Sequence, residues 1–225
     1  MCAIMVVFAL ALLPACASIQ EMVSGKQKPQ TGFRFLELLA EDDFESGEQW
    51  RQYADGADLF LGVRVGRYHI DFRGRQYAWA QRDGDFDDIV IEAEAAQVSS
   101  YDHNAYGLAC RLDPGNRGRG YFFLISGDGY ASIRWSNGRS LEPIASAAPS
   151  RHIMRGAATN RLRAVCVEDY LALWVNGEFV ADARDGRAAR GAVGLVGLMN
   201  YEGKRLSVAF DDLKIWRAVA DRPEI

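Results

Sequence analysis

The sequence predicts an all-β protein, built as a two-sheet antiparallel β-sandwich of the jelly-roll kind. Segments with alternating or continuous apolar side chains recur from residue 33 onward, and turn signals containing glycine separate them. Nothing between residues 33 and 217 has a convincing helical period. The chain has 225 residues, of which 49% are apolar, so one domain can bury a full core.

The strands follow from local patterns taken in chain order. Residues 87–95 alternate, with isoleucine and alanine side chains on one face and Glu92 and Glu94 on the other. A Ser-Gly-Asp-Gly turn and the pair Asn176-Gly177 each join two strand-like segments, and Asn-Gly is the strongest short hairpin signal. Further strands are expected over 104–112, 120–125, 129–135, 171–175, 178–182, 191–198 and 206–216.

Charge and motif content exclude several classes of function. The net charge is −4 and no stretch is strongly basic, so no nucleic-acid partner is expected, because neutralising phosphates needs a concentrated positive face. His69, His103 and His152 stand apart in the sequence, and no G-x-S-x-G motif occurs. Metal-hydrolase and serine-hydrolase chemistry therefore has little support.

The N-terminus carries the only long apolar run. The first 15 residues have no charge, and residues 3–13 form an unbroken apolar stretch followed by Pro14, Ala15 and Cys16, the length of a signal-peptide core before a small-residue cleavage site. Residues 13–16 resemble the lipobox of bacterial lipoproteins, which implies cleavage before Cys16 and lipid attachment to it. Two alternatives stay open: an uncleaved membrane helix over residues 1–19, and a plain secretory signal.

All of these alternatives export the chain. We expect a protein that is lipid-anchored to a membrane or at the outer surface, with the following division: a signal peptide over 1–15, the lipidated cysteine and a polar tether over 16–32, the β-domain over 33–217 and a tail over 218–225.

A run of motifs resembles one structural family. In order they are DDF and the tryptophan that follows, AYGLACR, GYFFLISGDGY, TNRLRAVC, LALWVNGEFV, GAVGL and VAFDDLKIW. The order resembles the concanavalin A-like jelly rolls of exported bacterial proteins, and in particular those related to the 3-keto-disaccharide hydrolase domain and to laminin-G-like modules. The resemblance spans roughly residues 39–216. It implies two stacked sheets, one with a concave outer face that often holds sugar, in members that include both enzymes and binding modules.

Two cysteines of the β-domain are candidates for a disulfide. Cys110 and Cys166 each lie inside a predicted strand on a face that looks inward. An exported protein with two such cysteines favours a bond between them, on neighbouring strands. The alternative is a pair of buried free thiols.

Acidic pairs bracket the β-domain. Asp42-Asp43 lie near its start and Asp211-Asp212 near its end. Because terminal strands of jelly rolls often lie together, oxygens of Asp43 and Asp211 are candidate ligands for a structural calcium ion, and no other cofactor is expected. The alternative is that these acids lie in solvated turns.

A candidate ligand-binding face follows from strand parity. If residues 88–97, 104–112, 120–126 and 129–135 form a simple meander, side chains sort into two faces. The expected core face carries Ile91, Ala93, Tyr106, Leu108, Cys110, Phe122, Leu124, Ala131, Ile133 and Trp135. The opposite face carries Glu92, Glu94, Arg111, Tyr121, Tyr130 and Arg134 over small residues at Gly107 and Ala109. Such a mixture of aromatic and charged groups suits a sugar, although the same charges could be ion pairs on a wet surface.

The function expected from this face is binding of a glycan or another envelope component. If the protein is an enzyme, Glu92 and Glu94 are the candidate catalytic carboxylates of a hydrolase acting on glycosidic bonds. The E-x-D-x-x-E pattern of laminarinase-type enzymes is not met, because the stretch reads E-A-E-A-A-Q. The alternatives are therefore a glycoside or 3-keto-sugar hydrolase, and a structural envelope protein that docks a protein partner.

Overall fold

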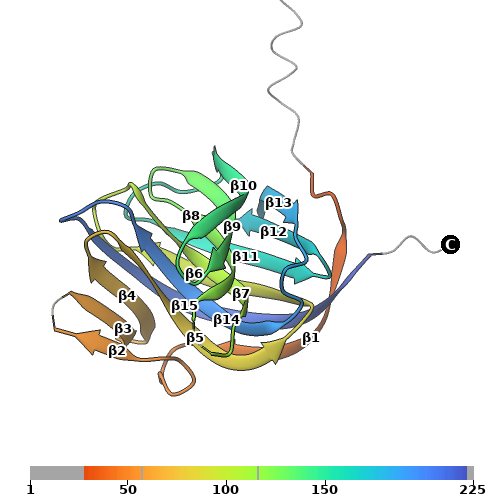
Figure 1. The fold of residues 1–225 in the computed structure, drawn as a ribbon, viewed down its shortest axis with the longest axis horizontal. Helices are drawn as coiled ribbons and strands as arrows, with labels where there is room; N and C mark the ends of the chain where they lie inside the picture. The colour runs from red at the N-terminus through yellow and green to blue at the C-terminus, as the bar shows by residue number, and fades with distance from the viewer. Residues whose placement is uncertain (1–27, 57, 116, 222–225) are drawn as a thin grey trace, which may run out of the picture.

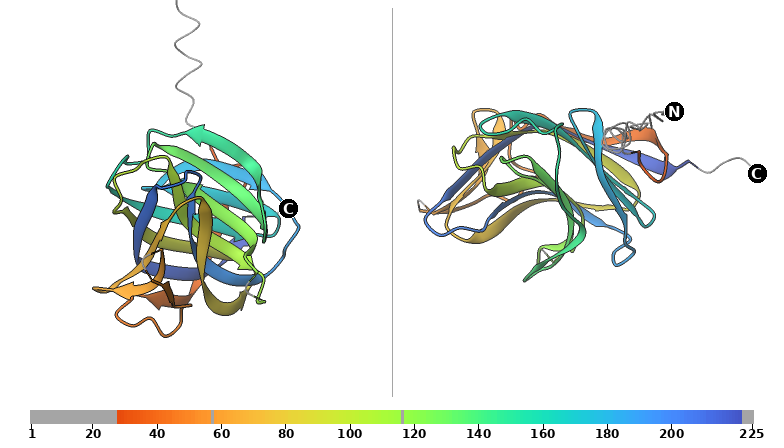
Figure 2. Two further views of the ribbon diagram at one scale, coloured as in Figure 1. Left: turned by 60° about the vertical axis from the view of Figure 1, so that its left-hand side comes forward. Right: turned by 90° about the horizontal axis from the view of Figure 1, so that it is seen from above.

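The structure is a computed structural model that describes residues 28–56, 58–115 and 117–221. In these residues every regular element is a β-strand, and the strands form two stacked antiparallel sheets (Figures 1 and 2), which confirms the predicted fold class. No helix in the described part of the chain is long and apolar enough to cross a membrane. Cys16 and the rest of the expected signal and anchor lie outside the described residues.

One sheet has nine strands. Its order is β13 (Glu178–Arg184), β12 (Tyr170–Val175), β11 (Thr159–Val167), β6 (Ile89–Gln97), β15 (Arg205–Ala220), β4 (Arg67–Arg73), β3 (Leu59–Arg64) and β2 (Tyr53–Asp55). The ninth strand, β1 (Phe33–Asp42), pairs with the second half of β15, beyond the part that pairs with β4. The strand β15 continues to Ala220, so regular structure extends past the expected domain end at residue 217.

The other sheet has six strands. Its order is β10 (Leu141–Pro149), β9 (Tyr130–Asn137), β8 (Arg119–Ile125), β7 (Asn104–Leu112), β14 (Gly191–Met199) and β5 (Gln76–Phe86). The right-hand view of Figure 2 shows this sheet curving, and β9 and β10 contact β13 of the nine-stranded sheet.

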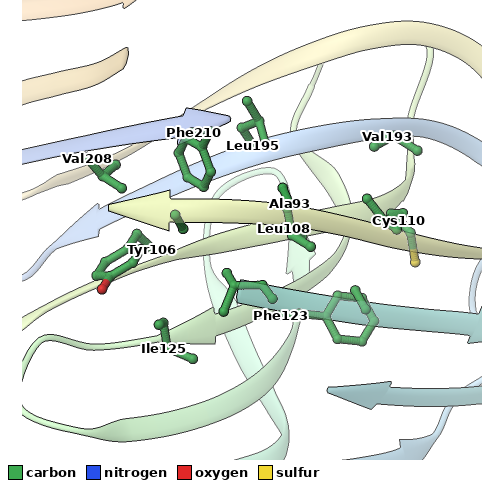
Figure 3. Packing of buried hydrophobic residues seen from close by; sticks show 14 of the residues in the cluster. Ala93, Tyr106, Leu108, Cys110, Phe123, Ile125, Val193, Leu195, Val208 and Phe210 are labelled. Atoms are coloured by element: carbon green, nitrogen blue, oxygen red, sulfur yellow. The ribbon is translucent and has the colours of Figure 1, made fainter. Parts of the chain in front are cut away.

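The core lies between the two sheets. Figure 3 shows Tyr106, Leu108 and Phe123 of the six-stranded sheet packing towards Ala93 and Phe210 of the nine-stranded sheet, all fully buried. Strand alternation makes this core, because inward positions of each strand are apolar at a period of two. The inward assignment of β6, β7 and β9 from sequence is confirmed by these buried side chains.

The disulfide between Cys110 and Cys166 is confirmed, but the expectation that it joins neighbouring strands is wrong. Cys110 lies on β7 of one sheet and Cys166 on β11 of the other, with their Cα atoms 6.9 Å apart. The bond therefore crosses the core and links the two sheets.

The expected four-strand meander is wrong in its first strand. β7, β8 and β9 are consecutive neighbours in the six-stranded sheet, whereas β6 lies between β11 and β15 in the other. The segment between β6 and β7 is thus a crossover between sheets, and its Val98 and Ser99 amides donate to the Ser207 carbonyl at the start of β15. Glu92 and Glu94 therefore cannot share a face with residues of β7–β9.

A second correction concerns β8. In the register with β7, Tyr121 lies opposite Cys110 and Phe123 opposite Leu108, and residues directly opposite share a face. Tyr121 and Phe123 consequently point into the core, while Phe122 and Leu124, which were expected there, belong to a separate apolar cluster on the outer face of the six-stranded sheet.

Candidate functional site

The outer face of the six-stranded sheet holds two adjoining pockets, which together we call the outer groove. Their volumes are about 490 Å³ and about 200 Å³. Both are lined by Arg134, Leu198 and Asn200, so they lie side by side. The larger pocket is further lined by Arg75, Gln76, Tyr77, Arg139, Ser140, Leu141 and Met199. The smaller one is further lined by His103, Asn104, Ala105, Leu124, Ile125, Ser126, Asp128, Tyr130, Ala131, Ser132, Ala147 and Tyr201.

Aromatic and aliphatic side chains form the floor of the outer groove. Tyr77 stacks on Trp79 with ring centroids 5.7 Å apart and meets the edge of Phe122 at 6.3 Å. Leu198, opposite Tyr77 in the register with β14, and Leu141 of β10 belong to the same cluster. These side chains stand here because Tyr77 and Trp79 alternate with the inward Ala78 and Ala80 of β5. The result is a partly exposed aromatic surface.

The aromatic floor is covered at one end by a loop. The φ angle of Gly118 is +65°, and a Cβ atom on it would lie 2.9 Å from the Trp79 ring, so only glycine lets this loop rest on the indole. Tyr77, which lines the larger pocket, is the ring of the stacked pair that a ligand can reach.

Polar groups surround this floor. Arg134 of β9 is half-buried between the two pockets, and its Nε donates to Ser132 Oγ at 3.3 Å. Tyr130 is 44% exposed and lines the smaller pocket. The one carboxylate in the lining, Asp128, has Oδ2 3.0 Å from His103 Nδ1, and its Oδ1 accepts from Ser126 Oγ. The arrangement offers a ring face for stacking and several donors around it.

Of the six residues predicted to form a binding face, the structure places two here, Tyr130 and Arg134. Gly107, expected to leave room for a ligand, serves a different purpose. A Cβ at Gly107 would lie 2.0 Å from the Phe123 carbonyl oxygen, so glycine is needed for the close approach of β7 and β8. Ala109 is fully buried in the floor cluster.

Arg111 is a structural residue, which corrects its assignment to the binding face. Its side chain is 1% exposed and pairs with Asp88 at 3.1 Å. Its Nη1 also donates to the carbonyls of Glu168 at 2.7 Å and Ala188 at 3.0 Å. The left-handed φ of 53° at Arg111 turns the side chain out of the strand alternation and into this set of acceptors. Burial lowers the pKa of the guanidinium, and the Asp88 carboxylate opposes that shift.

Tyr121 was also predicted on the binding face, but the structure places it in the core. It is fully buried, its hydroxyl donates to Asp185 Oδ1 at 2.8 Å, and it accepts from the Ala188 amide at 3.0 Å. Burial raises the pKa of this phenol to about 12. Tyr121 therefore reaches across the core and holds the segment that leads from β13 into β14.

Glu92 and Glu94 lie on the outer face of the nine-stranded sheet, away from the outer groove. Glu92 accepts from Arg163, and from Arg161 at 3.3 Å, both on the neighbouring β11. Glu94 lies opposite Arg161 on one side and Asp211 on the other. The cross-strand ion pairs considered as the alternative are thus present at Glu92.

Asp43 and Asp211 make separate contacts. Asp43 Oδ1 accepts from the Glu45 amide at 3.2 Å, and Asp211 pairs with Arg67 at 3.2 Å. The hollow that Asp43 lines contains Asp212 rather than Asp211. Within residues 28–56, 58–115 and 117–221, no group of three or more acidic, histidine or cysteine side chains is placed to hold a metal ion. Calcium binding by Asp43 and Asp211 stays a prediction from sequence.

Sequence reasoning missed the aromatic floor. Tyr77, Trp79 and Phe122 carry it, and the signal for the first two was the alternation in Gln-Tyr-Ala-Trp-Ala-Gln at residues 76–81. That pattern gives two rings on one face of a strand. Only the sheet order brings Phe122 of β8 beside them.

Comparison with known proteins agrees with this architecture. No protein-family model and no curated protein matches the chain. Among solved structures, the chain is similar to the carbohydrate-binding module CBM66 from Bacillus subtilis, at a TM-score of 0.59 and 11% identity over 77% of this chain and 96% of that one. It is also similar to a Bacillus subtilis protein of unknown function with a galectin-like fold, at a TM-score of 0.62 and 13% identity over 84% and 99% of the two chains.

A third similar structure contains bound saccharides. It is a LamA variant from Z. galactanivorans in complex with laminaritriose and laminaritetraose, at a TM-score of 0.55 and 12% identity over 82% of this chain and 100% of that one. At such identities the likeness establishes the fold. The protein is a jelly-roll β-sandwich, a fold that it shares with these structures.

Proposed function

We propose that the protein binds a glycan in the outer groove and is not a hydrolase. The observation that carries the proposal is the Tyr77 ring, backed by Trp79, in a groove with Arg134, Asn200 and Gln76 around it. A flat ring suits the apolar face of a pyranose, and surrounding donors and acceptors suit its hydroxyls. The fold shared with a carbohydrate-binding module supports the same function.

The distribution of carboxylates favours binding over hydrolysis. Glycosidases use two carboxyl groups about 5 to 9.5 Å apart on either side of the scissile bond. The lining of the outer groove contains a single carboxylate, Asp128, which is engaged by His103 and Ser126. Glu92 and Glu94, the candidates from sequence, lie on the other sheet. A sugar bound in the groove therefore meets no acid and base pair in the lining.

The first test is the variant Tyr77→Ala. Losing the stacking ring is expected to weaken binding about tenfold, the equivalent of about 1.4 kcal/mol. Tyr77→Phe keeps the ring and is expected to bind like the original chain. Oligosaccharides that bind in an array screen would be titrated by calorimetry with each variant.

Tyr53→Ala is the matched control, because Tyr53 is 43% exposed and lies on β2 of the other sheet. Thermal unfolding of each variant separates lost binding from lost folding. Unchanged affinity in a folded Tyr77→Ala protein would contradict the placement of the ligand in the outer groove.

We further propose that the domain is exported and anchored through lipid on Cys16. The disulfide between Cys110 and Cys166 supports export, because such bonds persist in oxidising compartments. Expressed in a bacterium, the protein should sediment with membranes, and Cys16→Ser should leave it in the soluble exported fraction. Firm attachment implies more than one acyl chain, because a single chain holds only marginally.

Cys16→Ser is measured against Cys2→Ser, a second cysteine of the N-terminal segment. Membrane fractions are compared by immunoblotting, with a shift in mobility as the sign of lipidation. A Cys16→Ser protein that stays with the membrane as firmly as the original would favour the uncleaved apolar helix instead.

A further inference from the structure

The charges around the larger pocket of the outer groove are unbalanced. Arg75, Arg134 and Arg139 all line it, and its lining contains no aspartate or glutamate. In the part of the chain that the structure describes, none of these three side chains forms an ion pair with a carboxylate. The chain as a whole has a net charge of −4, so this local excess of positive charge runs against its average.

Neither of the two acids nearest the larger pocket, Glu142 and Glu202, pairs with an arginine of the groove in the described residues. Glu142 follows Leu141 of the groove wall, but its Oε2 accepts from Arg187 Nη1 at 2.7 Å. Glu202 approaches Gly74, next to Arg75, yet no ion pair between Glu202 and Arg75 occurs in the described residues. Some surface arginines outside the groove are paired, as Arg217 is with Glu37 at 2.7 Å, whereas the three arginines of the groove gather around one pocket that lacks acids. The three groove arginines are thus left available to a ligand.

Arg134 is the best placed of the three. Its guanidinium is half-buried at the junction of the two pockets, and one contact, to Ser132 Oγ, uses only Nε. The two terminal nitrogens form a planar fork that matches a carboxylate or sulfate in a bidentate way. Arg75 and Arg139 are exposed on the rim of the same pocket.

From this arrangement we infer that the ligand of the outer groove is an acidic glycan, in which carboxylate or sulfate groups meet Arg134, Arg139 and Arg75 while a sugar ring stacks on Tyr77. The inference rests on the proposed glycan-binding function and specifies its ligand class. A neutral sugar would stack on the aromatic floor, but it would leave the three arginines without negatively charged acceptors. A simple polyanion would satisfy the arginines and leave the ring surface unused.

The test measures binding of the full-length chain to four probes by calorimetry. They are tetragalacturonate, a sulfated carrageenan tetrasaccharide, neutral laminaritetraose and tetraglutamate, an anion without sugar rings. At least one acidic sugar is expected to bind at least about tenfold more tightly than laminaritetraose and tetraglutamate. Its affinity should fall as salt rises from about 0.1 M to about 1 M, because the Debye length shrinks from about 10 Å to about 3 Å.

Variants test whether the arginines of the outer groove bind the acidic sugar. Arg134→Gln is expected to weaken binding of the acidic sugar about tenfold and to flatten its salt dependence. Arg205→Gln removes the same charge from an exposed position on β15 of the other sheet and is expected to have no effect. Thermal unfolding confirms that both variants are folded, and Arg139→Gln provides a second variant on the rim.

Each of the other possible outcomes contradicts either the acidic ligand or the proposed glycan binding. Laminaritetraose binding as tightly as the acidic sugars, with Arg134→Gln unchanged, overturns the acidic ligand and leaves glycan binding in place. Equal binding of tetraglutamate shows that the groove selects charge alone and overturns the inference. No binding of any sugar, here and in the array screen, overturns the proposed function together with the inference.

Discussion

Arg111→Ala is expected to destabilise the domain by about 3 kcal/mol, because it removes a fully buried donor from the part-exposed Asp88 carboxylate and from two backbone carbonyls. Its guanidinium is 1% exposed and holds the Asp88 carboxylate as well as the carbonyls of Glu168 and Ala188. Alanine leaves these acceptors without their donor and leaves a cavity where the buried side chain stood. Urea unfolding followed by tryptophan fluorescence measures the loss.

Arg217→Ala is the matched control for Arg111→Ala. Arg217 pairs with Glu37 at a similar distance of 2.7 Å, but the two side chains are 46% and 64% exposed. Such exposed pairs contribute about 0 to 1 kcal/mol. Equal stabilities of the two variants would contradict the structural role of Arg111.

Removing the disulfide is the other change with a large expected effect. The bond joins cysteines 56 residues apart in the sequence, and the chain-entropy relation assigns about 4 kcal/mol to closing a loop of that length. Replacing Cys110 and Cys166 together by alanine is expected to lower the free energy of unfolding by about that amount. Denaturant unfolding gives this value directly, provided the slope of the transition is compared as well.

Reduction of the unchanged protein is the complementary measurement. Thiol titration of the unfolded, unreduced domain is expected to find neither Cys110 nor Cys166 free, and reduced protein should unfold at lower denaturant than oxidised protein. Two reactive thiols before reduction would show that the bond does not form. A double alanine variant as stable as the original would show that it contributes nothing to stability.

The losses of stability caused by Arg111→Ala and by removal of the disulfide are expected not to be additive. Arg111 follows Cys110 on β7, and Glu168 lies two residues after Cys166. The disulfide and the Arg111 hydrogen bonds therefore join the two sheets at the same place. Neighbouring substitutions of this kind rarely add. A triple variant should thus lose a different amount from the sum of the separate losses.

Much of the fold was determined by local patterns in the sequence. The alternation of apolar residues in β6, β7 and β9 assigned their inward faces, and Asn176-Gly177 marked the hairpin between β12 and β13, where both residues have positive φ. The presence of the disulfide also followed from inward cysteines. These features depend on one strand or one turn at a time, and a period of two or a positive φ is visible in the residues themselves.

The candidate site was decided largely by tertiary structure. A short polar segment after β6 fits a hairpin as well as a crossover, and only long-range pairing with β11 and β15 places β6 in the other sheet. In β8 both faces are apolar and buried, so the alternation of Phe122 and Phe123 carries no sign of which one points inward. The register against Cys110 on β7 makes that choice.

Arg111 shows the same division between sequence and structure. An arginine within a strand reads as a surface residue, because a buried charge is costly unless it is paired. Here its acceptors come from Asp88, Glu168 and Ala188, which are far apart in sequence and meet only when the two sheets stack. Tyr77 and Phe122 likewise become one ring surface only through the order of the six strands. Periodicity thus determined which segments are strands and which faces are apolar, whereas sheet order and register, which depend on contacts between distant segments, decided which side chains meet in the outer groove.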